Sequence, residues 1–328
     1  MKKSSLKDIA EALGVSKALV SLVLNNKGDE RGINKETQIR VREKAKELNY
    51  TPNQYARGLR VGKTDTIGLI VPDISNVFYG KLCKAIEMKA SELGYDLMIS
   101  NSYEDTEREI KLINNLLSKS IDGLILASSL ENEKELDFLK KRNFPLVLID
   151  RIFDEFNVDS VSVSNIDGAR QGIKYLKSIN KKKIACVTIS PAYISSVTNR
   201  IKGYISELDD PSQALLIQVP HDNIEQGIVN ALEQIENNND IDAVFCVNNN
   251  LTKAMLREIN KKGLETKYTI LSFDDLEVFD FATPRVTTIA QPIEAIGEKA
   301  IQLLTNHIKN TDNHTPQKII FETGLIIR

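Results

Sequence analysis

The chain has 328 residues, of which 41% are hydrophobic and 27% charged, and its formal net charge is −2. This composition is typical of a soluble globular protein with room for two or three domains. No apolar run approaches the ~20 residues needed to cross a bilayer, which excludes a membrane-spanning protein. The N-terminus lacks the apolar segment and cleavage site of a signal peptide, so we expect a cytoplasmic protein with no membrane partner.

The charge is divided unevenly along the chain. Residues 1–63 carry 14 Lys and Arg against 7 Asp and Glu, whereas residues 64–328 carry 29 against 38. A basic segment joined to an acidic remainder favours a segment that meets phosphate, as in nucleic acid. A solvated basic face on an ordinary domain would give the same charge count. The pattern of predicted helices in residues 1–63 has to distinguish these two possibilities.

Two short helices are predicted in the basic segment. Ser5 and Asp8 have the spacing of a capping box, and an apolar stripe then runs to Gly14, which suits the end of a helix. Ser16 can cap a second helix immediately afterwards, and the apolar side of this helix is expected from Leu19, Val20, Val23 and Leu24. Two short helices joined by such a turn form a helix-turn-helix, and the N-terminal part of its second helix meets base edges in the major groove. The motif and its charge predict binding to double-stranded DNA over the alternative of a protein-binding module.

A third helix is predicted over residues 34–48, with Asn34 as its cap. Its apolar surface is expected from Ile39, Val41, Ala45 and Leu48. Pro52 then stops the helix, and Asn53 can cap a short further helix that has little of its own to bury.

From these motifs the head resembles the LacI/GalR family of bacterial repressors, and the resemblance continues to the C-terminus. The residues that carry it are Leu6, Asp8, Ala10, Gly14-Val15-Ser16, Val20-Ser21, Val23-Leu24-Asn25, Tyr50, Pro52-Asn53, Ala56 and Leu59. It implies a helix-turn-helix domain at 1–50, a hinge helix and linker at 51–63, and a two-lobed effector-binding and dimerisation body at 64–328. Leu59 matches the leucine that wedges into the minor groove in the family.

The helix pattern and the resemblance together give one set of candidate DNA contacts. They are Ser5, Leu6, Ser16, Lys17, Ala18, Ser21, Leu22, Asn25, Tyr50, Asn53, Ala56, Arg57 and Leu59. Leu19 and Leu22 stand where the family usually has Thr and Arg, so the operator preference of relatives is not carried over.

Apolar runs alternate with amphipathic stretches after residue 64. The runs predicted as strands buried on both faces are Thr66–Val71, Asp96–Ser100, Gly123–Ala127, Leu146–Ile149, Ile184–Ile189, Leu215–Val219, Ala243–Val247 and Thr269–Ser272. Amphipathic helices are predicted between them, for example over 79–93 and 224–237. The alternation predicts an α/β fold with doubly wound parallel sheets. About 265 residues exceed one such core, which favours two lobes, and the resemblance implies a body similar to periplasmic sugar-binding proteins with three crossovers.

Ligands in such sheets bind beyond the carboxyl ends of the strands. The candidate effector-binding residues there are Phe78, Tyr79, Asp150, Arg151, Arg200, Asn249, Asp274 and Gln291. Arg200 is expected to open a helix, and Asn249 stands where the family commonly has Asp. Planar polar groups with aromatic faces suit a sugar, and a purine could use the same groups by stacking. Helix capping is the alternative role for the acids and amides, and Arg151 and Arg200 make an anionic effector conceivable.

Three cysteines and three histidines offer no recognisable metal or disulfide pattern. Because they lie far apart in apolar segments, the cysteines are expected to be buried thiols: Cys83, Cys186 and Cys246. Each histidine is expected to have a structural or surface role: His221, His307 and His314. No G-x-G-x-x-G, Walker A or G-x-S-x-G motif occurs, so we expect no cofactor, no metal and no catalytic activity.

The sequence therefore predicts a transcriptional regulator, expected to be a repressor, that binds a pseudo-palindromic operator as a homodimer. A small effector, expected to be a sugar or sugar derivative, would bind between the lobes and change operator affinity. The alternatives are a regulator controlled by a protein partner or a purine, a sugar-binding transport protein, and an enzyme acting on sugars.

Overall fold

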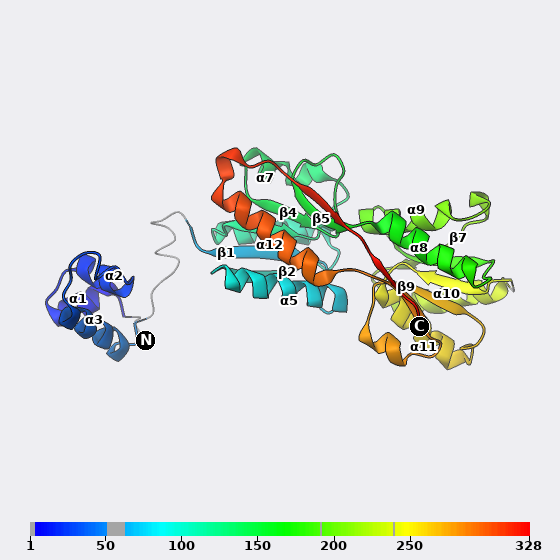
Figure 1. Ribbon diagram of the computed structural model, residues 1–328, viewed down its shortest axis with the longest axis horizontal. Coiled ribbons are helices and arrows are strands. Elements are labelled where there is room, and N and C mark those ends of the chain that lie inside the picture. Colours follow the sequence, from blue (N-terminus) through cyan, green and yellow to red (C-terminus); the bar gives the residue numbers. More distant parts are fainter. Residues whose placement is uncertain (1–3, 51–62, 191, 239) are drawn as a thin grey trace. The chain divides into compact units, whose positions relative to one another are not determined.

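The computed structural model describes residues 4–50, 63–190, 192–238 and 240–328. The chain divides into two compact units, Met1–Thr64 and Asp65–Arg328, which we call the head and the body (Figure 1). The predicted hinge at 51–63 falls almost wholly outside the described residues, and with it the candidate DNA contacts Asn53, Ala56, Arg57 and Leu59.

The head contains helices α1 (Leu6–Leu13), α2 (Lys17–Leu24) and α3 (Lys35–Glu47). The capping box of α1 is confirmed, because the Ser5 hydroxyl accepts from the amide of Asp8 at 3.3 Å and the Ser5 amide donates to its carboxylate at 2.6 Å. Gly14 ends α1 with a φ of 64°, and Ser16 caps α2 by accepting from Leu19 N–H at 3.1 Å. The predicted helix-turn-helix is therefore present.

The prediction that Ile39 contributes to the apolar surface of α3 is wrong, because 56% of this residue is exposed. Val41 and Ala45 face the core of the head, and the position three residues before Val41 on that face belongs to Gln38. Gln38 is buried, and its side-chain amide nitrogen donates to Asp29 and to the Ile33 carbonyl, each at 2.8 Å. These hydrogen bonds offset the cost of burying a polar group. Helical spacing thus turns Ile39 outward.

The described part of the body contains two six-stranded sheets. In order across the first sheet, its strands are β11 (Lys318–Phe321), β5 (Asp159–Val163), β4 (Leu146–Ile149), β3 (Gly123–Leu126), β1 (Thr66–Val71) and β2 (Asp96–Asn101). Across the second they are β12 (Gly324–Ile326), β10 (Val286–Ala290), β9 (Thr269–Phe273), β8 (Ala243–Cys246), β6 (Ile184–Ser190) and β7 (Leu215–Pro220). All neighbouring strands are parallel except β10 and β12, and the two orders correspond strand for strand.

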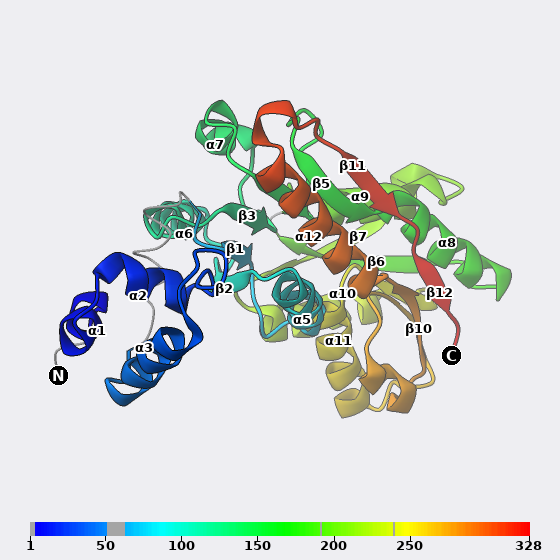
Figure 2. The same cartoon turned by 60° about the vertical axis from the view of Figure 1, so that its left-hand side comes forward.

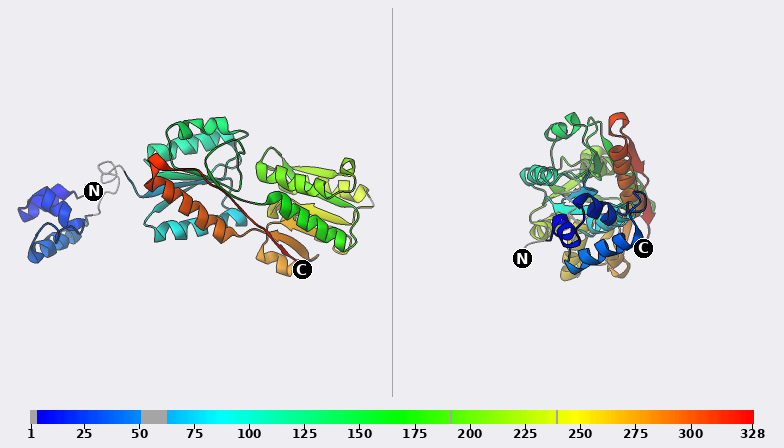
Figure 3. Two further views of the ribbon diagram at one scale, coloured as in Figure 1. Left: turned by 45° about the horizontal axis from the view of Figure 1, so that its top comes forward. Right: turned by 90° about the vertical axis from the view of Figure 1, so that its left-hand side faces the viewer.

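Helices cover both faces of each sheet, as a doubly wound fold requires (Figure 3). The first lobe holds α5 (Val77–Glu92), α6 (Thr106–Ser118), α7 (Asp137–Lys141) and α12 (Ile293–Lys309). The second holds α8 (Asn165–Ser178), α9 (Ser195–Ser206), α10 (Ile224–Asn237) and α11 (Asn249–Lys262). Short 3-10 helices are η1 (Glu133–Leu136), η2 (Pro211–Gln213), η3 (Glu277–Phe281) and η4 (Thr311–Asn313). None of the described helices is long and apolar enough to cross a membrane.

The chain passes between the lobes from β5 to α8, from β10 to α12, and from β11 to β12. Figures 1 and 2 show the last of these as the red strands that run from one lobe to the other. These are the three crossovers that the family resemblance implied.

Two expectations about the strands are wrong. Strands β2 and β7 are edge strands with partly exposed faces, not strands buried on both faces. Strand β5 was not predicted, because Asp159, Ser160 and Ser162 make its sequence look polar, yet every residue of β5 is buried. Burial of β5 between β4 and β11 comes from its tertiary neighbours and not from its own composition.

We predict that Gly203→Ala destabilises the body by about 2 kcal/mol, because overpacking has this cost. A Cβ at Gly203, within α9, would lie 2.4 Å from the Ile166 carbonyl oxygen and 2.7 Å from the Ala169 Cβ of α8. In an exposed helix the same substitution would stabilise the protein by about 1 kcal/mol. The sign of the change in unfolding free energy therefore shows whether Gly203 is tightly packed. Denaturant unfolding measures the effect, with Gly324→Ala as the control, since its Cβ would meet no atom within 4 Å. An unchanged or raised midpoint for Gly203→Ala would contradict close α8–α9 packing.

Candidate functional site

A cavity of about 140 Å³ lies between the two lobes, at the carboxyl ends of their strands. The residues around it are Pro72, Asp73, Asn76, Phe78, Tyr79, Glu104, Asp150, Arg151, Ile189, Ser196, Val197, Arg200, His221, Ile224, Asn248, Asn250, Asp274 and Gln291. Both lobes therefore contribute to one polar site.

Asp150 and Asp274 occupy corresponding positions in the two lobes. Asp150 follows β4 and donates its amide to Val161 of β5 at 3.0 Å, while Asp274 follows β9 and donates to Ile289 of β10 at 2.9 Å. Both adopt left-handed backbone, with φ of 61° and 73°. This conformation costs a non-glycine residue about 1–2 kcal/mol. Such strained residues cluster at functional sites, and both of these aspartates line the same cavity.

The Asp150 carboxylate is buried and held from both lobes. Its Oδ2 accepts a hydrogen bond from the Tyr79 hydroxyl at 2.8 Å, and its Oδ1 lies 3.8 Å from Nη2 of Arg200. Oδ1 has no hydrogen-bond partner among the described residues. Burial raises the pKa of the Tyr79 phenol well above its usual value, so this group donates and does not ionise. Oδ1 is thus the oxygen of Asp150 that makes no hydrogen bond within the described residues.

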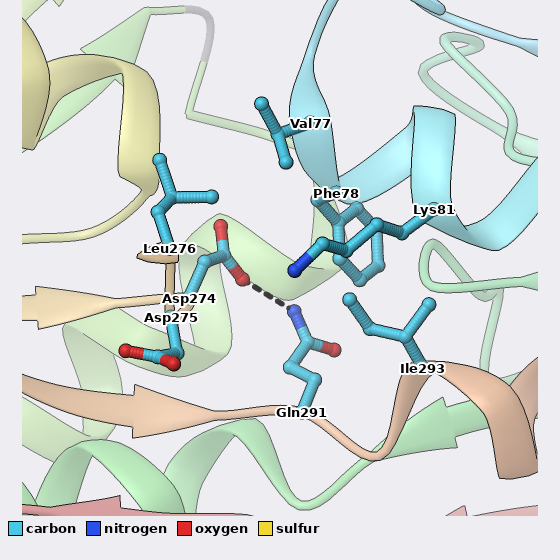
Figure 4. A pocket seen from close by; sticks show the side chains of 8 residues that line it. All are labelled: Val77, Phe78, Lys81, Asp274, Asp275, Leu276, Gln291 and Ile293. Carbon is cyan, nitrogen blue, oxygen red and sulfur yellow. Dashed lines mark hydrogen bonds between the residues drawn. The ribbon is translucent and has the colours of Figure 1, made fainter. Parts of the chain in front are cut away.

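The Asp274 carboxylate is also buried, and the Gln291 amide donates to its Oδ1 at 2.6 Å (Figure 4). Its Oδ2 accepts a hydrogen bond from the backbone N–H of Asn249 at 3.3 Å. Burial raises the pKa of Asp274, although the charge of Arg200 acts against this shift. A second cavity, of about 20 Å³, shares Phe78, Asp274 and Gln291 with the larger one and is too small for more than a water molecule or two.

The prediction that Arg200 opens a helix is wrong. Arg200 lies in the middle of α9, which begins at Ser195. Its Nε donates to Asn165 Oδ1 and its Nη1 to the Val247 carbonyl, both at 2.8 Å. Its guanidinium also stacks on Phe273, 3.7 Å from the ring centroid. Two of its nitrogens are therefore committed to the protein.

Arg151 is paired with Glu104 through two charge-assisted hydrogen bonds of 2.6 and 2.7 Å. Burial would raise the pKa of Glu104, but the charge and hydrogen bonds of Arg151 outweigh it and lower the pKa. Four carboxylates, of Asp73, Glu104, Asp150 and Asp274, line the cavity against two guanidinium groups. With both arginines engaged by the protein, this charge balance opposes the anionic effector that the sequence had made conceivable.

Seven of the eight candidate effector residues line the cavity. The exception is Asn249, which is fully buried and whose side-chain amide donates to Asn76 Oδ1 of the first lobe at 2.9 Å. Its neighbour Asn248 caps α11 by accepting from Leu251 N–H at 2.9 Å. Asn249 thus joins the lobes, and Asn248 and Asn250 reach the cavity in its place.

Sequence reasoning missed Glu104 and His221, which follow the edge strands β2 and β7. Both residues follow the carboxyl ends of predicted strands, which is where ligands bind in such sheets, so their positions in the sequence carry the signal. Ser196 and Ile224, near the starts of α9 and α10, were also missed. Nothing local distinguishes them from ordinary helix residues.

In the head, the first turn of α2 is open to solvent. Ser16, Lys17 and Ala18 are exposed, whereas Ser21 and Leu22 are half-buried. Ser5 and Asn25 are exposed as well, and Leu6 and Tyr50 pack against the head core. The candidate residues of α2 therefore lie at least partly exposed on the surface of the head.

Two family descriptions match this chain. "Bacterial regulatory proteins, lacI family" matches residues 5–53, and "Periplasmic binding proteins and sugar binding domain of LacI family" matches residues 64–327. The chain belongs to the LacI family. Its members are DNA-binding transcriptional regulators and not enzymes.

The relatives match along almost the whole chain. The HTH-type transcriptional regulator DegA of Bacillus subtilis is 30% identical, over 99% of this chain and 97% of its own length. The ribose operon repressor of Halalkalibacterium halodurans is 30% identical, over 99% and 96%. The lac repressor dimer bound to operator and the anti-inducer ONPF has the same fold, with a TM-score of 0.85 at 23% identity, over 100% and 98%.

We predict that Glu104→Gln lowers the free energy of unfolding by about 3 kcal/mol at pH 7, because it removes the carboxylate that accepts two hydrogen bonds from the buried Arg151 and leaves that charge only the more distant Asp150, at 3.8 Å. Gln keeps the size of the side chain at a position with φ of 59°. Since the folded pKa of Glu104 is lowered, the wild-type advantage is present above its ordinary pKa and is lost as pH falls through the folded value. Denaturant unfolding from pH 7 to pH 3 measures this.

The control for that variant is Asp209→Asn, which breaks the pair of Lys177 with a fully exposed carboxylate and should cost less than about 1 kcal/mol. Equal losses in the two variants, or a Glu104→Gln loss that persists unchanged at pH 3, would contradict a stabilising Glu104–Arg151 pair.

Proposed function

We propose that this LacI-family regulator is a repressor that binds a pseudo-palindromic operator as a homodimer in the bacterial cytoplasm. The exposed first turn of α2 carries Ser16, Lys17 and Ala18, the arrangement that a helix-turn-helix uses in the major groove. The other proposed contacts are Ser5, Leu6, Ser21, Leu22, Asn25, Tyr50, Asn53, Ala56, Arg57 and Leu59. We keep the domain division at 1–50, 51–63 and 64–328 as part of this proposal.

The effector is a neutral sugar, and the observation that supports this most is the pair of buried carboxylates, Asp150 and Asp274, around one cavity. Carboxylates accept hydrogen bonds from hydroxyl groups, and the volume of about 140 Å³ suits a ligand of monosaccharide size. Phe78 and Tyr79, whose rings pack edge to face at 5.0 Å, supply the apolar contact that the C–H faces of a sugar need. The proposed effector contacts are Phe78, Tyr79, Asp150, Arg151, Arg200, Asp274 and Gln291. Asn249, the remaining candidate, is proposed to act through its hydrogen bond to Asn76.

The excess of carboxylates makes a sugar phosphate or sugar acid a poor fit, since a like charge in a mostly buried site is strongly disfavoured. The family description of the body names a sugar-binding domain, and one relative is named as a ribose operon repressor. Both agree with a polyhydroxyl ligand without identifying it.

Direct hydrogen bonds across the cleft would transmit binding to the lobes. Asn249 donates to Asn76, the Tyr193 hydroxyl donates to the Ser129 carbonyl at 3.0 Å, and the Ile152 amide donates to the Ser195 hydroxyl at 2.9 Å. A ligand in the cavity changes the relative free energies of lobe arrangements that keep or lose these bonds. It can alter operator affinity only through this difference in affinity for the two arrangements.

We predict that a neutral pentose or hexose, and not its phosphate or acid, raises the thermal midpoint of the full chain by about 5–10 °C at ~100 times its dissociation constant. A panel of sugars, sugar phosphates, sugar acids and purines tests this. Asp274→Asn should weaken binding by at least about tenfold, because a hydrogen bond to a charged acceptor is lost, while Asp209→Asn should not. A purine as the best ligand would favour the purine alternative, and an unchanged affinity in Asp274→Asn would remove that residue from the site.

We predict that Lys17→Ala weakens binding to the operator more than binding to unrelated sequences, as loss of a contact to a base edge does, and that the lost charge reduces the slope of log K against log salt by about 1. Lys174→Ala, in α8 of the body, makes the same charge change and should leave the slope unchanged. The measurement is a fluorescence-anisotropy titration at several salt concentrations. Identical slopes for the two variants would argue against α2 as the DNA-contacting helix.

A further inference from the structure

Two histidines near the end of α12 meet a distant aspartate in the first lobe, away from the residues that line the effector cavity. His307 lies near the C-terminal end of α12, His314 follows η4, and Asp159 opens β5. Spacing alone predicted no metal grouping for these histidines, because the carboxylate that completes the cluster is about 150 residues away. Among the described residues, these three form a group whose possible ligand atoms all lie within 4.8 Å of one another.

The Asp159 carboxylate is at the centre of the cluster and its side chain is fully buried. Its Oδ2 lies 2.6 Å from Nε2 of His314 and 3.7 Å from Nδ1 of His307. Its Oδ1 accepts from the amide of Gln317 at 2.8 Å, which holds the carboxylate in place. The carboxylate thus presents one oxygen to both imidazoles, oriented by a backbone donor.

His307 gives an independent indication that something binds here. Its side chain is only 10% exposed, yet neither ring nitrogen has a hydrogen-bond partner among the described residues. Buried polar atoms are almost always paired, and an unpaired pair of ring nitrogens in a native protein calls for a missing partner. The ring stacks on His314, with centroids 4.0 Å apart and planes 10° apart, and Nδ1 is the atom nearest the carboxylate.

We propose that Asp159, His307 and His314 form a binding site for a divalent transition-metal ion such as Zn²⁺. Two imidazole nitrogens and one carboxylate oxygen are ligands that this class of ion prefers, and a water molecule would complete a tetrahedron. With bonds of about 2.0–2.1 Å, binding requires Asp159 and His314 to separate slightly and His307 to approach. A metal ion must also lie in the plane of each ring, so the His307 ring has to tilt out of the stack, and no hydrogen bond opposes this.

The site would tie α12 to β5 and to the segment leading into β11. Helix α12 begins two residues after Gln291, so the effector cavity lies near its first turn and the metal site near its last. The ion would therefore stabilise the first lobe without contacting the effector. This proposal does not depend on the identity of the effector.

The test uses the full chain without a histidine tag, stripped with a chelator and titrated with Zn²⁺ by calorimetry at pH 7.5. We expect one equivalent per chain and a higher thermal midpoint. His307→Ala and His314→Ala should each weaken Zn²⁺ binding by at least about tenfold. His221→Ala, which removes the remaining histidine of the chain, is the matched control and should keep the affinity for Zn²⁺. Both His variants must retain cooperative unfolding, and either one alone suffices if the other fails to fold.

Three outcomes would overturn the proposal. The first is no bound equivalent at tens of micromolar Zn²⁺, and the second is undiminished binding in His307→Ala and His314→Ala. The third is a thermal midpoint that does not rise with Zn²⁺, because an ion bound to the folded first lobe must stabilise it.

Discussion

The structure of the body depends on two sheets of mainly parallel strands, whose strands point their carboxyl ends toward the same cavity. Each sheet presents the end of a corresponding strand, β4 or β9, and each end carries an aspartate in left-handed backbone, Asp150 or Asp274. Two carboxylates in one mostly buried cavity repel each other and lose hydration. The site therefore requires compensating donors, and much of the surrounding structure supplies them.

Those donors come from both lobes. Arg200 reaches the region from the middle of α9, held by Asn165 and the Val247 carbonyl, and its charge acts on both aspartates. Tyr79 donates to Asp150 from α5, and Gln291 donates to Asp274 from a crossover. Of these contacts, only the 3.8 Å approach of Arg200 Nη2 to Asp150 Oδ1 joins the two lobes. The lobes are also joined by direct hydrogen bonds such as the one from Asn249 to Asn76. A ligand that changes these inter-lobe contacts would act on the lobe arrangement itself.

Helix α12 links regions with different chemistry. Its N-terminal end follows a crossover beside the cavity, and its C-terminal end carries His307 against the buried Asp159. The helix packs on α5, which supplies Phe78 and Tyr79 to the cavity. Stability added at the far end of α12 would therefore favour the lobe that holds the aromatic side of the effector site.

The sequence by itself determined the helix-turn-helix, the alternation of strands and helices, and seven of the residues around the cavity. It could do so because caps such as Ser5 and Ser16, and buried runs such as Thr66–Val71, act through near neighbours in the chain. Only tertiary structure decided that β5 is buried despite its serines, that Ile39 faces solvent, and that Asn249 joins the lobes instead of lining the cavity. The pairing of Glu104 with Arg151 and of Asp159 with two histidines also depends on segments brought together by folding. In these cases burial and charge pairing depend on neighbours in space that the local sequence does not specify.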